Sequence, residues 1–201
     1  MYGFFYGPGS VNQKLFMLIN HADLPFLDAV MPVFTILGGS WIFYLYFVLM
    51  LVCYVIDKRV MLGKYLVVYL VATIFSLGAE DALKSFFHVP RPALAIGMEQ
   101  VRVLGKFSTS YALPSGHAVF SFMTAFTLSY GRGWRWHTPL FLFAVLVAWS
   151  RVYVGAHYPL DVAAGGVVGV LCGFIVWRSY EQVRKRFSPP RDGGVTSPPR
   201  T

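Results

Sequence analysis

Apolar residues in this chain form long uninterrupted runs, separated by short polar and basic segments. Residues 29–56, for example, carry no charged side chain, and about 20 apolar residues suffice for a helix to cross a bilayer. Pro32 and the pair Gly38–Gly39 indicate a bend in the first part of that run. We predict about five transmembrane helices, roughly over residues 34–56, 62–84, 114–131, 137–153 and 158–178.

The N-terminal segment has a different pattern. Ser10 and Gln13 have the spacing of a capping box that opens a helix. Apolar residues then recur at helical spacing, at Val11, Leu15, Leu18, Ile19 and Ala22. We therefore predict an amphipathic helix over residues 10–22 that lies on the membrane surface and ends before Pro25.

The C-terminal tail differs in composition from the rest of the chain, and this difference marks the domain boundary. Residues 188–201 are basic and rich in proline, a composition typical of a disordered tail. The remaining residues, 1–187, form a single domain in this interpretation. The predicted fold is all-α, a multi-pass membrane helical bundle with an interfacial N-terminal helix.

Composition supports a membrane protein. Of the 201 residues, 56% are hydrophobic and 13% are charged, whereas a soluble domain carries about 25% charged residues. The net charge of +8 does not indicate a nucleic-acid partner, because the cations sit in short clusters between the apolar runs. Such clusters set membrane topology and attract anionic lipid headgroups.

Loop charge predicts the orientation. With five spans, most basic residues outside the candidate site fall on one side of the membrane: Lys58, Arg59, Lys64, Arg132, Arg135, Arg178, Arg184, Lys185 and Arg186. The positive side is normally cytoplasmic. We expect a protein of the cell (inner) membrane whose candidate site faces the extracytoplasmic side.

Three short segments share one chemistry. They contribute Lys84, Arg91 and Pro92; then Pro114, Ser115, Gly116 and His117; then Ser150, Arg151, His157 and Asp161. Together they supply three cations, two histidines, a carboxylate and a turn of small residues. This set can bind a phosphate and cleave its ester bond through histidine.

In the last segment, Pro159 suits the first turn of a helix, which places His157 just before that helix and Asp161 inside it. The carboxylate can then accept a proton from one imidazole nitrogen and direct the other as a nucleophile. Alone, the pair is also compatible with a helix-capping aspartate and a surface histidine.

The middle segment leads directly into an apolar helix. A helix N-terminus binds phosphate through its free N–H groups, Gly116 allows close backbone approach, and Ser115 can donate its hydroxyl. His117 would lie beside the phosphate and protonate the leaving oxygen. An N-cap serine followed by an interfacial histidine is the alternative.

Taken together, the three segments resemble the signature of the type 2 phosphatidic acid phosphatase superfamily, which also includes vanadium haloperoxidases, and they match it at every position. The resemblance implies a helical bundle, no metal or other cofactor, and a phosphohistidine intermediate on His157. It implies His117 as the general acid and Asp161 as the residue that orients His157. The implied phosphate ligands are Lys84, Arg91, Ser115, Gly116 and Arg151.

We predict an integral membrane lipid phosphatase whose partners are the bilayer and a lipid phosphate. The resemblance to small bacterial members of the superfamily implies undecaprenyl diphosphate, phosphatidylglycerol phosphate or a related lipid phosphate as the substrate, with lipid A as an alternative. A vanadate-dependent haloperoxidase and a non-catalytic lipid-binding or transport protein are the alternatives. Arg102 and Lys106 either contact a lipid headgroup or belong to a solvated loop, and Glu80 is expected to pair with Lys84 or a loop cation rather than to act in catalysis.

Overall fold

A computed structural model describes residues 2–58 and 62–187, and in this part of the chain every regular element is helical. The elements are α1 (Tyr2–Tyr6), α2 (Val11–Asn20), α3 (Pro25–Leu37), the 3-10 helix η1 (Ser40–Ile42), α4 (Phe43–Ile56), α5 (Gly63–Phe87), α6 (Pro92–Ile96), α7 (Gly116–Ser129), α8 (Trp134–Tyr153) and α9 (Pro159–Phe187). The all-α prediction is confirmed. The predicted disordered tail lies outside the described residues.

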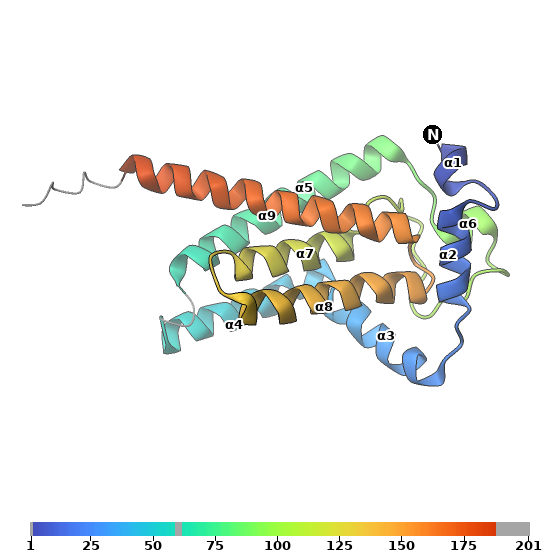
Figure 1. Ribbon diagram of the computed structural model, residues 1–201, viewed down its shortest axis with the longest axis horizontal. Helices are drawn as coiled ribbons and strands as arrows, with labels where there is room; N and C mark the ends of the chain where they lie inside the picture. The colour runs from blue at the N-terminus through green and yellow to red at the C-terminus, as the bar shows by residue number, and fades with distance from the viewer. Residues whose placement is uncertain (1, 59–61, 188–201) are drawn as a thin grey trace, which may run out of the picture.

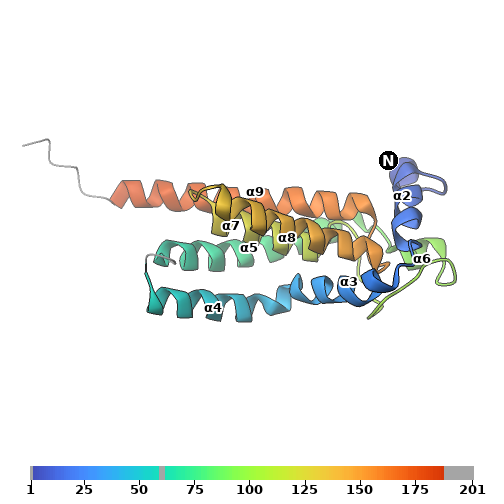
Figure 2. The same cartoon turned by 60° about the horizontal axis from the view of Figure 1, so that its bottom comes forward.

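Helices α5, α7, α8 and α9 run side by side, and α3 and α4 lie along one flank of this bundle (Figures 1 and 2). Helix α7 contacts all three of its neighbours in the bundle. Glycines let α9 approach α7 closely: a Cβ at Gly169 would lie 2.3 Å from the Val119 carbonyl oxygen, and one at Gly165 would lie 2.7 Å from that of Ser115. Small residues at such contacts are typical of packed membrane helices.

The structure supports a membrane bundle but fewer certain spans than the sequence pattern predicts. Two stretches, Gly63–Ile96 and Pro159–Phe187, are long and apolar enough to cross a membrane. A third exists if Pro25–Leu37 and Ser40–Ile56 form one span bent by 57°. The count of five spans stays a prediction, since α7 has only 14 residues.

The predicted helix over residues 34–56 is broken. Helix α3 ends at Leu37, and α4 begins after Gly38, Gly39 and η1. A Cβ at Gly38 would lie 2.1 Å from the side chain of Val147 on α8, so a glycine here lets the bend pack against the bundle. As a result, α3 turns toward the end of the bundle where the candidate site lies.

Helix α2 begins as the capping pattern predicts, since Ser10 Oγ accepts a hydrogen bond from the Gln13 amide at 3.2 Å. Its buried face is different from the expected apolar stripe. Asn12, Phe16 and Asn20 face the protein, whereas Val11 and Leu18 are more than 70% exposed. The helix lies across the end of the bundle (Figures 1 and 2), and its position on the membrane surface stays a prediction.

Candidate active site

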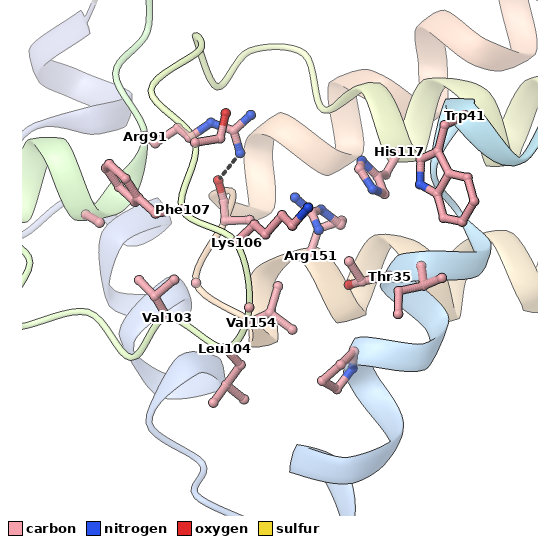
Figure 3. A pocket seen from close by; sticks show the side chains of 17 residues that line it. Thr35, Trp41, Arg91, Val103, Leu104, Lys106, Phe107, His117, Arg151 and Val154 are labelled. Carbon is pink, nitrogen blue, oxygen red and sulfur yellow. Dashed lines mark hydrogen bonds between the residues drawn. The ribbon is translucent and has the colours of Figure 1, made fainter.

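The three predicted site segments meet at one end of the bundle, where α5 and α8 end and α7 and α9 begin (Figure 1). A cavity of about 590 Å³ opens there. Arg91, His117 and Arg151 lie on its wall, and Val103 and Leu104 contribute apolar surface (Figure 3). The residues that line the cavity do not include the other predicted site residues, Lys84, Ser115, Gly116, His157 and Asp161.

The imidazole of His157 is only 1% exposed. Its Nε2 lies 3.4 Å from Nη1 of Arg91. Because a guanidinium can only donate hydrogen bonds, Nε2 is the acceptor and the ring proton belongs on Nδ1. His157 therefore presents a lone pair on Nε2 toward the group that would bind a phosphate.

Electrostatics favour the neutral imidazole. Burial, followed by the positive charges of Arg91 and Arg151, holds the pKa of His157 well below its usual value of 6.5. A neutral imidazole is the form that acts as a nucleophile. The arginines that would bind the phosphate thus add to the effect of burial in favouring the neutral histidine.

Asp161 lies in the first turn of α9 and is fully buried. Its Oδ2 is 3.6 Å from Nδ1 of His157, a distance too long for a hydrogen bond. The carboxylate instead accepts hydrogen bonds from the Tyr6 hydroxyl at 2.7 Å and the Tyr158 amide at 2.8 Å. The predicted His157–Asp161 pair is therefore adjacent but not hydrogen-bonded, and the orienting role of Asp161 stays a prediction.

Arg91 is held in place by backbone and side-chain acceptors. Its Nε donates to the Ser110 carbonyl at 2.9 Å, its Nη2 to Ser110 Oγ at 2.8 Å, and its Nη1 to the Ala156 carbonyl at 3.2 Å. Arg151 differs, because its buried Nε has no hydrogen-bond partner among the described residues. Arg91 is thus fixed in orientation, and Arg151 has donor capacity left for a ligand.

Ser115 caps α7 at the same place. The residue is fully buried, and no described residue hydrogen-bonds its Oγ. A buried hydroxyl without a partner is unfavourable by about 1–3 kcal/mol, and a phosphate at the N-terminus of α7 would satisfy it. This serine therefore fits the phosphate-binding role that the sequence predicts.

Lys84, a predicted phosphate ligand, has a carboxylate partner within its own helix. Its Nζ donates to Oε1 of Glu80 at 2.5 Å. That carboxylate also packs against the start of α7, since a Cβ at Gly116 would lie 2.1 Å from Glu80 Oε1. The pairing expected of Glu80 is present, and it holds the ammonium group beside Gly116.

Arg102 and Lys106, the two cations of the loop between α6 and α7, have different surroundings. The guanidinium of Arg102 pairs with Asp28 and lies 3.2 Å from Asp23, and its amide donates to Oδ1 of Asn20 at 2.9 Å. Lys106 lines the cavity instead (Figure 3). The sequence offers no local signal for this division, because Arg102 meets partners more than 70 positions away.

Comparison with known proteins identifies the family. The sequence profile of the PAP2 superfamily matches residues 65–185, which is more than half of the chain. The chain belongs to this superfamily. The resemblance predicted from the three segments is therefore confirmed, and all three segments lie inside the matched region.

Among curated PAP2 relatives, an undecaprenyl-diphosphatase of Sulfolobus acidocaldarius is 32% identical over 82% of this chain and 76% of its own length. A lipid A 4'-phosphatase of Porphyromonas gingivalis is 25% identical over 88% of this chain and 76% of its length. The names of these similar proteins therefore state different substrates.

Two crystal structures share the fold. Aquifex aeolicus LpxE has a TM-score of 0.73 and 32% identity, over 84% of this chain and 96% of that one. A transmembrane PAP2-type phosphatidylglycerolphosphate phosphatase from Bacillus subtilis has a TM-score of 0.69 and 23% identity, over 88% and 87% of the two chains. At 23% identity, the second structure is evidence for a shared fold only.

Proposed function

We propose that this membrane lipid phosphatase transfers the phosphoryl group of a lipid phosphate or diphosphate to Nε2 of His157 and then releases it to water. The observation that carries the proposal is the orientation of His157, whose Nε2 accepts from Arg91 beside a cavity that Arg91, Arg151 and His117 line. A phosphate drawn to the two arginines would lie next to the nucleophile.

In the first step, the Nε2 lone pair attacks phosphorus and the bond to the leaving oxygen breaks. Arg91 and Arg151 balance the charge on the equatorial oxygens, and Ser115 donates its hydroxyl. His117 gives a proton to the leaving oxygen. In the second step, His117 accepts a proton from water, which attacks the phosphohistidine and frees inorganic phosphate.

Lys84 joins this site if its ammonium group turns from Glu80 toward the phosphate. The two side chains are one helical turn apart on α5, and the lysine would give up this ion pair to bind the phosphate. We expect the negative charge of a bound phosphate to compete with the Glu80 carboxylate for this cation.

The cavity favours a lipid whose headgroup carries a second anionic group. Its apolar wall includes Ile36 and Trp41 from the α3–η1 region and Phe107 from the loop, and Lys106 adds a cation to the arginines (Figure 3). Undecaprenyl diphosphate and phosphatidylglycerol phosphate have this chemistry. The similarity to lipid A 4'-phosphatases supports lipid A as the second candidate.

The orientation is part of the proposal. The opposite end of the bundle carries Lys58, Lys64, Arg132 and Arg135, and such basic ends are normally cytoplasmic. We place the site at the extracytoplasmic face of the cell (inner) membrane. Labelling of single cysteines at positions 105 and 64, in a background without Cys53 and Cys172, tests this, and labelling of position 105 only from the cytoplasm would reverse it.

Phosphate release from a panel of these lipids by the purified protein in liposomes, with excess chelator, tests the activity. We expect turnover without divalent metal, inhibition by vanadate, and no turnover by His157→Ala. The control is His137→Ala at the far end of α8, which should retain activity. Near-normal turnover by His157→Ala would refute the mechanism, and halide oxidation with vanadate and peroxide but no phosphate release would favour the haloperoxidase alternative.

A further inference from the structure

The N-terminal helices reach the active site although they lie outside the region that the family profile matches, residues 65–185. The Tyr6 hydroxyl on α1 donates a hydrogen bond of 2.7 Å to Oδ1 of Asp161. Both partners are buried, with Tyr6 8% and Asp161 0% exposed. Residue 6 thus contacts the carboxylate that faces the nucleophilic histidine.

This contact is built into the packing of the N-terminal segment. The Tyr6 ring meets the Tyr158 ring edge-on at 5.4 Å, and Phe16 on α2 packs against the same ring at 5.3 Å. Asn12 on α2 accepts a hydrogen bond from the Leu160 amide at 3.0 Å, which satisfies one of the free N–H groups at the start of α9. Helices α1 and α2 therefore hold both the first turn of α9 and its carboxylate.

The two hydrogen bonds to Asp161 fix the plane of the carboxylate. The terminal torsion of an aspartate is broad, so a single donor would leave the second oxygen free to turn. Tyr6 holds Oδ1 and the Tyr158 amide holds Oδ2. Oδ2 is also the oxygen that faces Nδ1 of His157, so the position of Oδ1 determines where Oδ2 points.

We infer that Tyr6 is a positioning residue for catalysis, which acts through Asp161 to hold the His157 ring with Nε2 toward the phosphate. This inference rests on the proposed function. Tyr6 does not line the cavity, so it has no contact with a substrate there. Its removal should slow the chemical step and leave substrate binding unchanged.

Tyr6→Phe tests this, because it deletes the hydroxyl and keeps the ring that packs on Tyr158. A hydrogen bond to a charged group is strong enough that its loss should lower kcat by roughly tenfold or more, with KM unchanged. The matched control is Tyr65→Phe: Tyr65 is also buried, at 3% exposure, and donates to the Tyr130 carbonyl at 2.9 Å at the other end of the bundle. That variant should lose thermal stability to a similar extent and keep its kcat.

The outcomes separate the two proposals. If His157→Ala is inactive, any of three results overturns the positioning role. These are a wild-type kcat in Tyr6→Phe, an altered KM with kcat unchanged in the same variant, and a loss of kcat to the same extent in Tyr65→Phe. Turnover by His157→Ala would instead overturn the proposed function itself. A kcat loss confined to Tyr6→Phe, with KM retained, supports the role.

Discussion

Arg132 at one end of the bundle and Arg91 and Arg151 at the other have different surroundings. At the end away from the site, the guanidinium of Arg132 lies between two aromatic rings, 4.0 Å from the centre of Tyr65 and 4.2 Å from that of Trp136. At the site end, polar groups position Arg91, and Arg151 keeps a buried N–H without a partner among the described residues.

The difference shows how the same side chain is adapted to two tasks. Stacking on aromatic rings stabilises a cation and holds it at the membrane interface. Hydrogen bonds to carbonyl oxygens orient a guanidinium while its charge remains uncompensated, so it attracts an anion. At the site end Arg91 is held in this second way, and the candidate phosphate site lies beside it.

The largest contrast should come from the histidines of the two ends. His117→Ala removes the expected proton donor and should lower kcat by about two to four orders of magnitude, whereas His137→Ala near the other end should have no effect. Single-turnover measurements should show that both formation and hydrolysis of the phosphoenzyme are slowed. Equal rates for the two variants would remove His117 from the mechanism.

The arginines themselves should show the next largest effect. Arg151→Ala should reduce kcat/KM by roughly 10²- to 10³-fold, as expected for loss of one donor to a transition-state oxyanion. The matched substitution Arg132→Ala should leave kcat/KM within about twofold of wild type, since no chemistry is expected at that end. If both variants lost activity equally, the functional contrast between the two ends would fail.

A pH profile sharpens the comparison. Protonated His157 cannot attack, and its pKa is held well below 6.5, so the acidic fall of kcat/KM should lie well below pH 6.5. Arg91→Gln removes one of the positive charges that lower this pKa and should move the acidic limb to higher pH, while Arg132→Gln should not move it. Burial is the larger cause, so the shift should be partial; no shift would show that Arg91 does not act on His157.

A smaller effect is expected on the choice between lipid headgroups. Lys106→Ala should weaken preference for a diphosphate over a monophosphate lipid by about tenfold, the effect expected for one charged contact. Arg102→Ala is the control, because that residue is engaged with aspartates outside the cavity. An unchanged ratio of kcat/KM for the two lipids in Lys106→Ala would exclude its role in selection.

For Arg132→Ala we expect a change in stability alone. Loss of a cation–π contact should lower the free energy of unfolding by about 1 kcal/mol, or roughly 2–4 °C in Tm for a protein of this size. A thermal shift assay in detergent measures it. An unchanged Tm would mean that the aromatic rings do not stabilise this end of the bundle.

The sequence by itself determined the helical character, the family and the residues of the candidate site. Apolar runs and helix caps are local patterns, so they could be interpreted within a few residues. The three site segments were recognisable because each combines unusual residue types at a fixed spacing, with Arg91, His117 and Arg151 among them. Their common position also followed from the order of the helices, because successive antiparallel spans return to the same end.

Only the tertiary structure decided which partners these residues have. The Tyr6–Asp161 hydrogen bond joins residues 155 positions apart, and the Arg102–Asp28 pair joins residues 74 positions apart. The buried face of α2 likewise depends on which surface of the bundle it covers, so Asn12 and Asn20 face inward although the apolar stripe lies elsewhere. Such contacts depend on how helices pack against one another. The hydrophobic periodicity of one segment does not specify which residues of another helix it will contact.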